Sequence, residues 1–208
     1  MVMKIRIIKK AAEKMDFAVE GVSLAFANAL RRIMISEVPT MAVAWADVHD
    51  NTSVLFDEML VHRIGLLPVK FDPDKFNFME ECKCEGKGCS LCQSVFVVHK
   101  TGPGMVYSGD MKSSNKTVKF TDEKFPVVEL LKNQELKLEA VARLGRGTEH
   151  SRYQAAIVGY EYDSEAKPLQ FTFHMETVSG LKPEYILTKA VEILKEKSAE
   201  FKEQAVKL

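Results

Sequence analysis

Apolar and polar residues alternate at the start of the chain, over residues 3–7 and again over residues 15–20. A period of two is typical of a strand with one buried face, and the polar residues between the two segments indicate a turn. The pattern therefore predicts a β-hairpin of two half-buried strands. In the first strand, Met3, Ile5 and Ile7 form the apolar face.

The period changes after Gly21 to apolar residues spaced by three or four, which predicts an amphipathic helix. Ser23 is a suitable N-cap, and Pro39 ends the helix. The apolar stripe consists of Leu24, Ala27, Leu30 and Met34, widened by Phe26 and Ile33.

The end of the chain repeats this style. Residues 169–176 alternate cleanly, and a long helix is predicted from about Pro183, a good first-turn residue. Its stripe is Leu187, Val191, Leu194, Phe201 and Ala205. Because a hairpin alone is marginally stable, we expect the two ends to fold together. The prediction is an α+β domain of three strands and two amphipathic helices, made from residues 1–40 and 164–208.

The middle of the chain, residues 41–163, is predicted to be an inserted β-rich domain. Strand candidates cover residues 41–49, 95–99, 117–120 and 135–142, and the first of these is apolar enough to be largely buried. A short helix is expected over Asp57–Ile64, stopped by Gly65 and Pro68.

All four cysteines of the chain lie in residues 82–92, at Cys82, Cys84, Cys89 and Cys92. Four thiolates on a short loop fit a tetrahedral zinc ion, and Gly86 and Gly88 allow tight turns between the pairs. No histidine adjoins the loop and no thiol is missing, so a closed structural site is favoured over a catalytic one. We expect this loop to be ordered with metal and loose without it.

Other uses of these cysteines stay open. Cys84, Cys89 and Cys92 also match part of a plant-type [2Fe–2S] pattern, although no cysteine follows Cys92. Disulfides, free thiols or a redox pair at Cys89 and Cys92 are further alternatives.

Composition narrows the function classes. The 208 residues carry 29 basic and 29 acidic side chains, so the formal net charge is zero. Proteins that grip nucleic acid through their own surface usually show a basic excess, so direct DNA binding is not expected. No apolar run approaches the length of a membrane helix and no signal peptide is recognisable, which favours the cytoplasm.

Signs of catalysis are missing from the sequence. There is no phosphate loop, nucleophile elbow or His-Glu-x-x-His motif, and the five histidines are scattered. We therefore expect neither a catalytic residue nor a small-molecule substrate. Residues 143–153 form a basic, glycine-containing segment that fits an exposed turn or a partner contact. Two striped helices over one three-stranded sheet carry surplus apolar surface, which suggests a protein partner.

Residues 27–69, ANALRRIMISEVPTMAVAWADVHDNTSVLFDEMLVHRIGLLPV, resemble the signature of the α/D family of DNA-dependent RNA polymerase subunits. Supporting blocks are CKCEGKGCSLC, ARLGRGTEHSRYQAA and HMETVSGLKPEYILTKAVEILKEK. Archaeal members, the counterparts of the third-largest eukaryotic subunit, are the most similar.

The resemblance implies a split dimerisation domain with an inserted β-rich domain and, where the cysteine loop is present, one zinc ion. It implies pairing with a smaller α-like subunit, called L in archaea. The pair would then be a platform for subunits N and P and for the second-largest catalytic subunit. Implied partner contacts are Leu24, Ala27, Asn28, Leu30, Arg31, Arg32, Ile33, Leu187, Val191 and Leu194. Implied large-subunit contacts are His62, Arg63, Gly65, Pro68, Gly145, Gly147 and His150.

One departure from the family pattern matters. Many archaeal members carry an additional ferredoxin-like domain with cysteines for an iron–sulfur cluster, whereas here residues 159–176 contain no cysteine. No iron–sulfur cluster is therefore expected. Two rival functions stay open: an independent zinc-dependent nucleic-acid-binding module, and a redox protein that uses Cys89 and Cys92.

Overall fold

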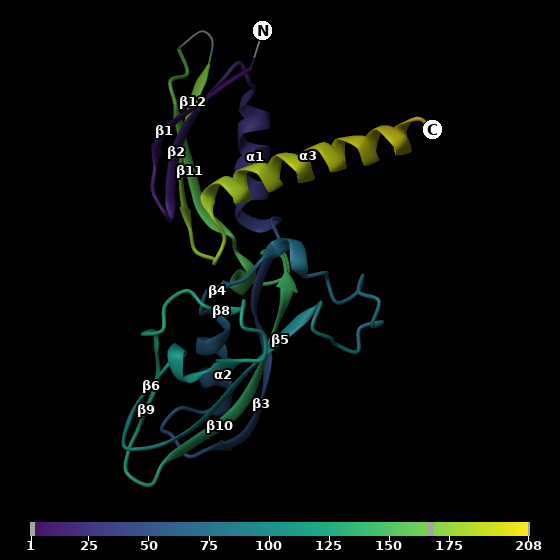
Figure 1. Ribbon diagram of the computed structural model, residues 1–208. Helices are drawn as coiled ribbons and strands as arrows, with labels where there is room; N and C mark the ends of the chain where they lie inside the picture. Colours follow the sequence, from purple (N-terminus) through teal and green to yellow (C-terminus); the bar gives the residue numbers. More distant parts are fainter. Residues whose placement is uncertain (1–2, 166–168, 208) are drawn as a thin grey trace. The chain divides into compact units, whose positions relative to one another are not determined.

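A computed structural model describes residues 3–165 and 169–207. The described residues form antiparallel sheets and three α-helices, as the α+β prediction requires. Contacts divide the chain into two units (Figure 1). The first, here called the terminal unit, comprises residues 1–39, 146–150 and 154–208; the second, the inserted unit, comprises residues 40–145 and 151–153.

The terminal unit has a four-stranded antiparallel sheet in the order β1-β2-β12-β11. Its strands are β1 (Lys4–Lys10), β2 (Lys14–Glu20), β11 (Ala156–Tyr162) and β12 (Gln170–Thr177). Three of them were predicted. The fourth, β11, lies before the predicted boundary at residue 164 and pairs along its whole length with β12, which draws it into this unit.

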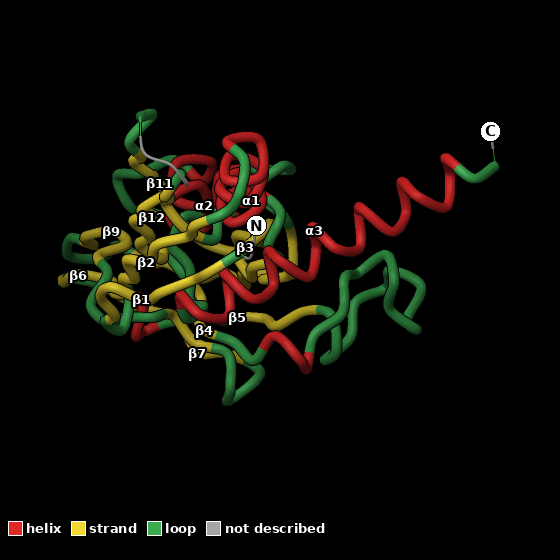
Figure 2. Tube along the Cα trace, turned by 90° about the horizontal axis from the view of Figure 1, so that it is seen from above, coloured by secondary structure: helices red, strands yellow, loops and turns green. Residues whose placement is uncertain are grey.

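The two helices of this unit are α1 (Leu24–Ser36) and α3 (Pro183–Ala205). Ser23 caps α1 by accepting a hydrogen bond from the backbone N–H of Phe26 at 3.2 Å, and Pro183 occupies the first turn of α3. Both helices contact the sheet and each other. Both views show the C-terminal half of α3 extending away from its own sheet (Figures 1 and 2).

The buried stripe of α3 differs from the prediction. The helix buries Pro183, Ile186 and Ala190, whereas Val191 and Phe201 are 47% and 76% exposed. The predicted apolar stripe therefore lies beside the stripe that is buried. Only the N-terminal part of α3 buries side chains against the rest of the terminal unit.

The inserted unit has a second antiparallel sheet in the order β3-β10-β5-β7. These strands are β3 (Thr40–Asn51), β5 (Gln93–Thr101), β7 (Lys112–Ser113) and β10 (Glu135–Gly145). Two short ribbons add β4 (Val69–Lys70) with β8 (Lys119–Phe120), and β6 (Gly104–Tyr107) with β9 (Pro126–Leu130). Helix α2 covers Asp57–Gly65, close to the prediction. Single 3₁₀ turns are η1 (Pro73–Lys75), η2 (Ser108–Asp110) and η3 (Ser151–Tyr153).

The strand predicted at residues 41–49 is buried only in its first part. From Trp45 onward its outward-facing residues are exposed, because the second half of β3 has one face on the core and one in solvent. The core of this unit includes Leu60 and Ile64 of α2, and Phe96 stacks on Phe120 with ring centroids 4.5 Å apart.

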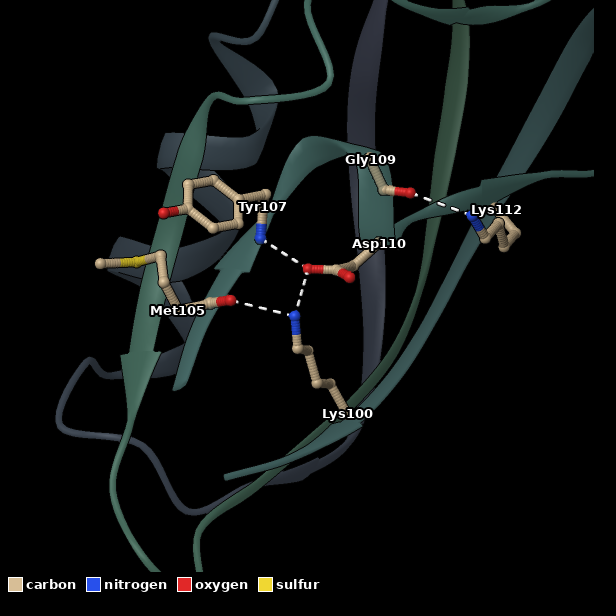
Figure 3. A network of polar contacts seen from close by, with 6 residues as sticks. All are labelled: Lys100, Met105, Tyr107, Gly109, Asp110 and Lys112. Atoms are coloured by element: carbon tan, nitrogen blue, oxygen red, sulfur yellow. Dashed lines mark hydrogen bonds and ion pairs between the residues drawn. The ribbon is translucent and has the colours of Figure 1, made fainter. Parts of the chain in front are cut away.

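A polar network fastens the connection between β5 and β7 (Figure 3). The Lys100 ammonium donates to Asp110 Oδ2 at 2.6 Å and to the carbonyl of Met105 at 3.0 Å. The same Asp110 oxygen accepts the backbone N–H of Tyr107 at 2.8 Å. One ion pair thus joins three consecutive elements of the inserted unit.

None of the helices in the described part of the chain combines the length and apolarity required to cross a bilayer. Residues 166–168 fall within the segment for which the sequence predicted no additional domain, and they lie outside the described residues.

Candidate metal centre and subunit-contact surfaces

The four predicted cysteines come together in one cluster. Their sulfur atoms all lie within 4.8 Å of one another, and the side chains of Cys82 and Cys92 are buried. The Sγ–Sγ distances are 3.6 Å for Cys82–Cys89, 3.6 Å for Cys84–Cys92 and 3.8 Å for Cys89–Cys92.

These distances fit a tetrahedral thiolate site. With metal–sulfur bonds of about 2.3 Å, the edge of a ZnS₄ tetrahedron is about 3.8 Å. A disulfide requires about 2.05 Å between sulfurs, and all four cysteines are free thiols. Four cysteines in this arrangement have the ligand count and spacing to bind a metal ion.

The backbone of the loop makes this convergence possible. Glu85, Gly86 and Gly88 adopt positive φ angles of 54°, 77° and 83°, so the chain reverses between the two cysteine pairs. The backbone N–H of Cys92 donates to the carbonyl of Cys89 at 3.0 Å, which closes the second turn. The two glycines occupy backbone positions that other residues would adopt with strain.

The electrostatics of the cluster favour a bound cation. Burial acts to raise the pKa of Cys84, but hydrogen bonds with the Cys82 and Cys92 thiols outweigh it and lower that pKa to about 7. Burial raises the pKa of Cys92 to about 12. Thiolates this close together repel one another, so a bound cation would favour the ionised form of the cluster.

The edge strand β1 carries an apolar surface that the sequence did not predict. Ile7 pairs with Phe17 of β2, which pairs with Phe173 of β12, so all three lie on the same face. Phe17 and Phe173 are fully buried, whereas Ile5 and Ile7 are 60% and 55% exposed.

The prediction of a half-buried first strand is therefore wrong. Its side chains alternate as expected, but α1 packs on β11 and α3 on β2 and β12. Helix α3 meets the end of β1 through the Lys10–Glu184 ion pair, and Ile5 and Ile7 stay exposed. The apolar face of the sheet continues onto β1 without cover from the described residues of the terminal unit.

The residues predicted on α1 divide into three groups, which are buried, exposed and partly exposed. Ala27, Leu30 and Ile33 are between 1% and 4% exposed, so they belong to the core of the terminal unit. Leu24 and Arg32 are exposed. Ala27, Leu30 and Ile33 therefore hold α1 in place by packing, and their side chains are not accessible to a partner.

Two further α1 residues are partly exposed and interact with each other. Arg31 donates from Nη2 to Asn28 Oδ1 at 3.0 Å and from Nε at 3.3 Å. On α3, Leu187 and Leu194 are half-buried and flank the exposed Val191. We define the exposed apolar set of the terminal unit as Ile5, Ile7, Leu24 and Val191, together with the half-buried Leu187 and Leu194 that flank Val191.

The predicted block on α2 combines exposed and structural residues. Arg63 donates to the carbonyls of Val127 and Pro126 at 3.1 and 3.2 Å, which ties α2 to β9. His62 is exposed and Pro68 is half-buried.

Gly65 packs closely against its neighbours. A Cβ atom there would lie 3.1 Å from Arg152 Nη1 and 3.3 Å from the carbonyl oxygen of Val43. Arg152 Nη1 itself donates to the carbonyls of Val43 and Ala44 at 2.7 and 2.9 Å. Glycine at position 65 thus makes room for an arginine that bridges two carbonyls of β3.

The segment at residues 143–153 is less exposed than a free turn. A Cβ atom on Gly145 would lie 2.6 Å from the buried ring of Tyr153, and one on Gly147 would lie 2.9 Å from Ser36 Cα. His150 is exposed. The two glycines are thus steric requirements within their own units, which is an alternative to direct partner contact.

Comparisons with known proteins agree with this organisation. Residues 16–198 match the family model described as the RNA polymerase Rpb3/Rpb11 dimerisation domain. A protein named DNA-directed RNA polymerase subunit Rpo3 from Archaeoglobus fulgidus is 44% identical over 158 residues, which cover 76% of this chain and 60% of the relative. The Rpo3 subunits of Pyrococcus horikoshii and Methanosarcina mazei are 41% and 40% identical over 77% of this chain.

The chain spans about three fifths of the length of these relatives. The family match nevertheless includes both α1 and most of α3, together with the metal loop between them. On this evidence, the chain belongs to the RNA polymerase Rpb3/Rpb11 dimerisation domain family.

Proposed function

We propose that this chain is a non-catalytic assembly subunit of a DNA-dependent RNA polymerase. It pairs through its terminal unit with the smaller α-like subunit, L in archaea. The pair then forms the platform for subunits N and P and for the second-largest catalytic subunit. Relatives named as polymerase subunits and a family model named for dimerisation support this proposal.

The observation that carries the proposal is the exposed apolar set of the terminal unit. Ile5 and Ile7 continue an apolar sheet face whose other members are fully buried, and Val191 of α3 is 47% exposed. Exposed apolar side chains of this kind are typical of subunit contacts, and obligate interfaces commonly bury about 2,000 Å² or more. The carboxyl-terminal helix and the edge strand then supply the contact, rimmed by Asn28, Arg31 and Arg32.

The placement of Leu30 determines how this pairing is tested. An aspartate at this 3%-exposed position would disrupt the unit itself, so lost pairing would be uninformative. Ile7→Glu and Val191→Glu instead place a charge on residues that are already in solvent. We expect either variant to weaken pairing with co-expressed L at least about 30-fold, the factor that corresponds to loss of an interface hot spot.

The matched control is Val54→Glu, the same change at a 78%-exposed residue of the inserted unit. Size-exclusion chromatography and a pull-down measure pairing, and thermal unfolding checks that each variant still folds. Normal pairing of both terminal-unit variants would contradict the proposed contact. Salt-sensitive DNA binding by the chain alone would instead favour the nucleic-acid-binding module.

We also propose that the metal is one structural zinc ion, held by Cys82, Cys84, Cys89 and Cys92. The near-tetrahedral sulfur spacing supports this assignment, and zinc supplies positive charge without redox chemistry. Elemental analysis of the purified chain should find one zinc atom per chain, lost in Cys84→Ser. Iron with visible absorbance would support a cluster, and an oxidised Cys89–Cys92 pair would support the redox alternative.

A further inference from the structure

The outer face of the β3-β10-β5 sheet contains an apolar row. Trp45 of β3 pairs across the strands with Val141 of β10, which pairs with Val95 of β5. Directly opposite residues of neighbouring strands lie on the same face. Trp45 is 40% exposed and Val97, one step further along this face of β5, is 42% exposed.

The next row places two negative charges side by side. Asp47 of β3 is directly opposite Glu139 of β10, which is directly opposite Val97. Like charges at opposed positions destabilise a sheet. His49 lies 3.7 Å from Glu139, but the Asp47 carboxylate has no ion pair or hydrogen bond with any other residue of the described ranges 3–165 and 169–207.

In the third row of the same face, the charges of opposed residues balance one another. Asp50 is directly opposite Lys137, which is directly opposite His99. His99 Nε2 in turn lies 2.6 Å from Glu135 Oε1. Each charge in this row faces a group of opposite or titratable charge, so the imbalance is confined to the row of Asp47 and Glu139.

Arg143 and Lys112, two of the cations near this row, are engaged elsewhere, and Lys137 lies in the next row opposite Asp50. Arg143 lies 3.6 Å from Glu80, and its guanidinium carbon lies 5.8 Å from the centroid of the Tyr153 ring. Lys112, opposite Val97 on β7, donates to the carbonyl of Gly109 at 3.1 Å, as drawn in Figure 3. The Asp47 carboxylate, beside an exposed indole, is therefore left for an external cation, while Glu139 adds negative charge next to it and lies near His49.

We infer that this face, defined by Trp45, Asp47, Val97 and Glu139, is a second docking surface, and that its occupant is an arginine-bearing apolar segment of another polymerase subunit. Residues two apart on a strand are separated by about 6.7 Å, so one guanidinium can stack on Trp45 while it pairs with Asp47. Arginine fits better than lysine because its planar group stacks on aromatic rings and bonds carboxylates bidentately. An aliphatic neighbour of that arginine covers Val97. Nucleic acid does not fit, since its phosphates would meet two carboxylates.

This inference rests on the proposed function, because the occupant is another polymerase subunit. Trp45 is the single tryptophan of the chain, so labelling the chain with 5-fluorotryptophan marks this face alone. The labelled chain is first paired with L and then mixed with unlabelled companion subunits, added one at a time. We expect one addition to shift the ¹⁹F resonance and to remove its sensitivity to solvent exchange between H₂O and D₂O.

The charge requirement is tested with the double variant Asp47→Asn/Glu139→Gln, which keeps the size of both side chains. We expect it to weaken binding of that subunit about 30-fold or more, as loss of a buried charge pair does. The matched control is Glu129→Gln, an exposed strand glutamate on β9 of the same unit. Trp45→Leu, with binding followed by co-elution, tests the stacking contact separately.

Two separate measurements report pairing with L and docking at the second surface. Co-elution with L reports the proposed function, and the Trp45 resonance reports the second surface. An assembled complex in which the resonance never changes overturns the inference and leaves the proposed function intact. A shift on concentrating the free chain, a shift on adding DNA, or full binding by the double variant also overturns it. A chain that enters no complex refutes both.

Discussion

The two sheets of this protein leave different surfaces open. In the terminal unit, one apolar face runs from fully buried Phe173 and Phe17 to Ile7, which is 55% exposed. In the sheet of the inserted unit, the inner face is closed, with Leu136 and Leu138 fully buried, and the open face carries an apolar row next to the facing carboxylates of Asp47 and Glu139. The sheet of the terminal unit therefore leaves part of its apolar face open, whereas the sheet of the inserted unit buries its inner face and has unbalanced charges on its outer face.

This difference separates two ways in which a subunit can be prepared for assembly. Apolar surface without cover favours an obligate partner, since exposure of such surface costs about 25 cal/mol per Å². A charged face is stable in water and favours a partner that arrives later and is selected by charge. The inserted unit adds the cysteine loop, whose four thiols could bind a metal ion where the chain has little regular structure.

Removal of the metal is expected to have the largest effect, and one confined to the inserted unit. Structural zinc contributes about 10–16 kcal/mol in small peptides, and the loop is tightly turned around its four thiols. Chelation, or Cys92→Ser, should open the loop to trypsin at Lys83 and Lys87 within minutes. Pairing with L should persist. Loss of pairing together with the metal would show that the two units do not act separately.

A matched pair of glycine substitutions tests packing in the two units and is expected to have an intermediate effect. Gly145→Ala in the inserted unit would place a methyl 2.6 Å from the buried Tyr153 ring, which should destabilise the protein by about 1–3 kcal/mol. The methyl added by Gly159→Ala in β11 has no neighbour within 4 Å, and the substitution removes the extra backbone freedom that glycine has in the unfolded chain. Urea unfolding should show a lower midpoint for the first variant and an unchanged or higher midpoint for the second. Equal midpoints would contradict the steric role of Gly145.

The elements that the sequence predicted well are those determined by local chemistry. Ser23 as a cap, Pro183 in a first turn, and four cysteines within eleven residues are short-range signals, and each appears in the structure as expected. Helix α2 likewise ends at Gly65. Local patterns carry enough information because the interacting atoms belong to neighbouring residues.

The exposure of β1 could not be predicted in this way. Its alternation is as regular as that of β2, but burial depends on how far α1 and α3 reach across the sheet. Strand β11 was missed because Gly159 interrupts its alternation and Ile157 points outward, 59% exposed. Ribbon β6–β9 depends on pairing between segments about 20 residues apart. The Asp47–Glu139 pair likewise arises from register, which one strand alone does not specify.

The smallest expected effect concerns two ion pairs, one in each unit. Burial acts to raise the pKa of Asp110, but hydrogen bonds from Lys100 and the N–H of Tyr107 outweigh it, so that pKa lies below its usual value. A carboxyl with a lowered folded-state pKa stabilises the fold above its unfolded pKa of about 3.9, and this contribution is lost as pH falls through the folded value. In the terminal unit, the Lys14–Glu176 pair is more than half exposed on both sides and is screened by water.

Asp110→Asn should therefore reduce stability at neutral pH by about 1 kcal/mol, and the difference from the unmodified chain should shrink below about pH 4. Lys14→Met should leave stability unchanged at both pH values. Urea unfolding at pH 7 and pH 3 measures both variants, each compared with the unmodified chain at the same pH, because thiolate ligands release their metal in acid. Equal sensitivity of the two variants would mean that the Lys100–Asp110 network, despite joining three elements of the inserted unit, is as weak as an isolated surface pair.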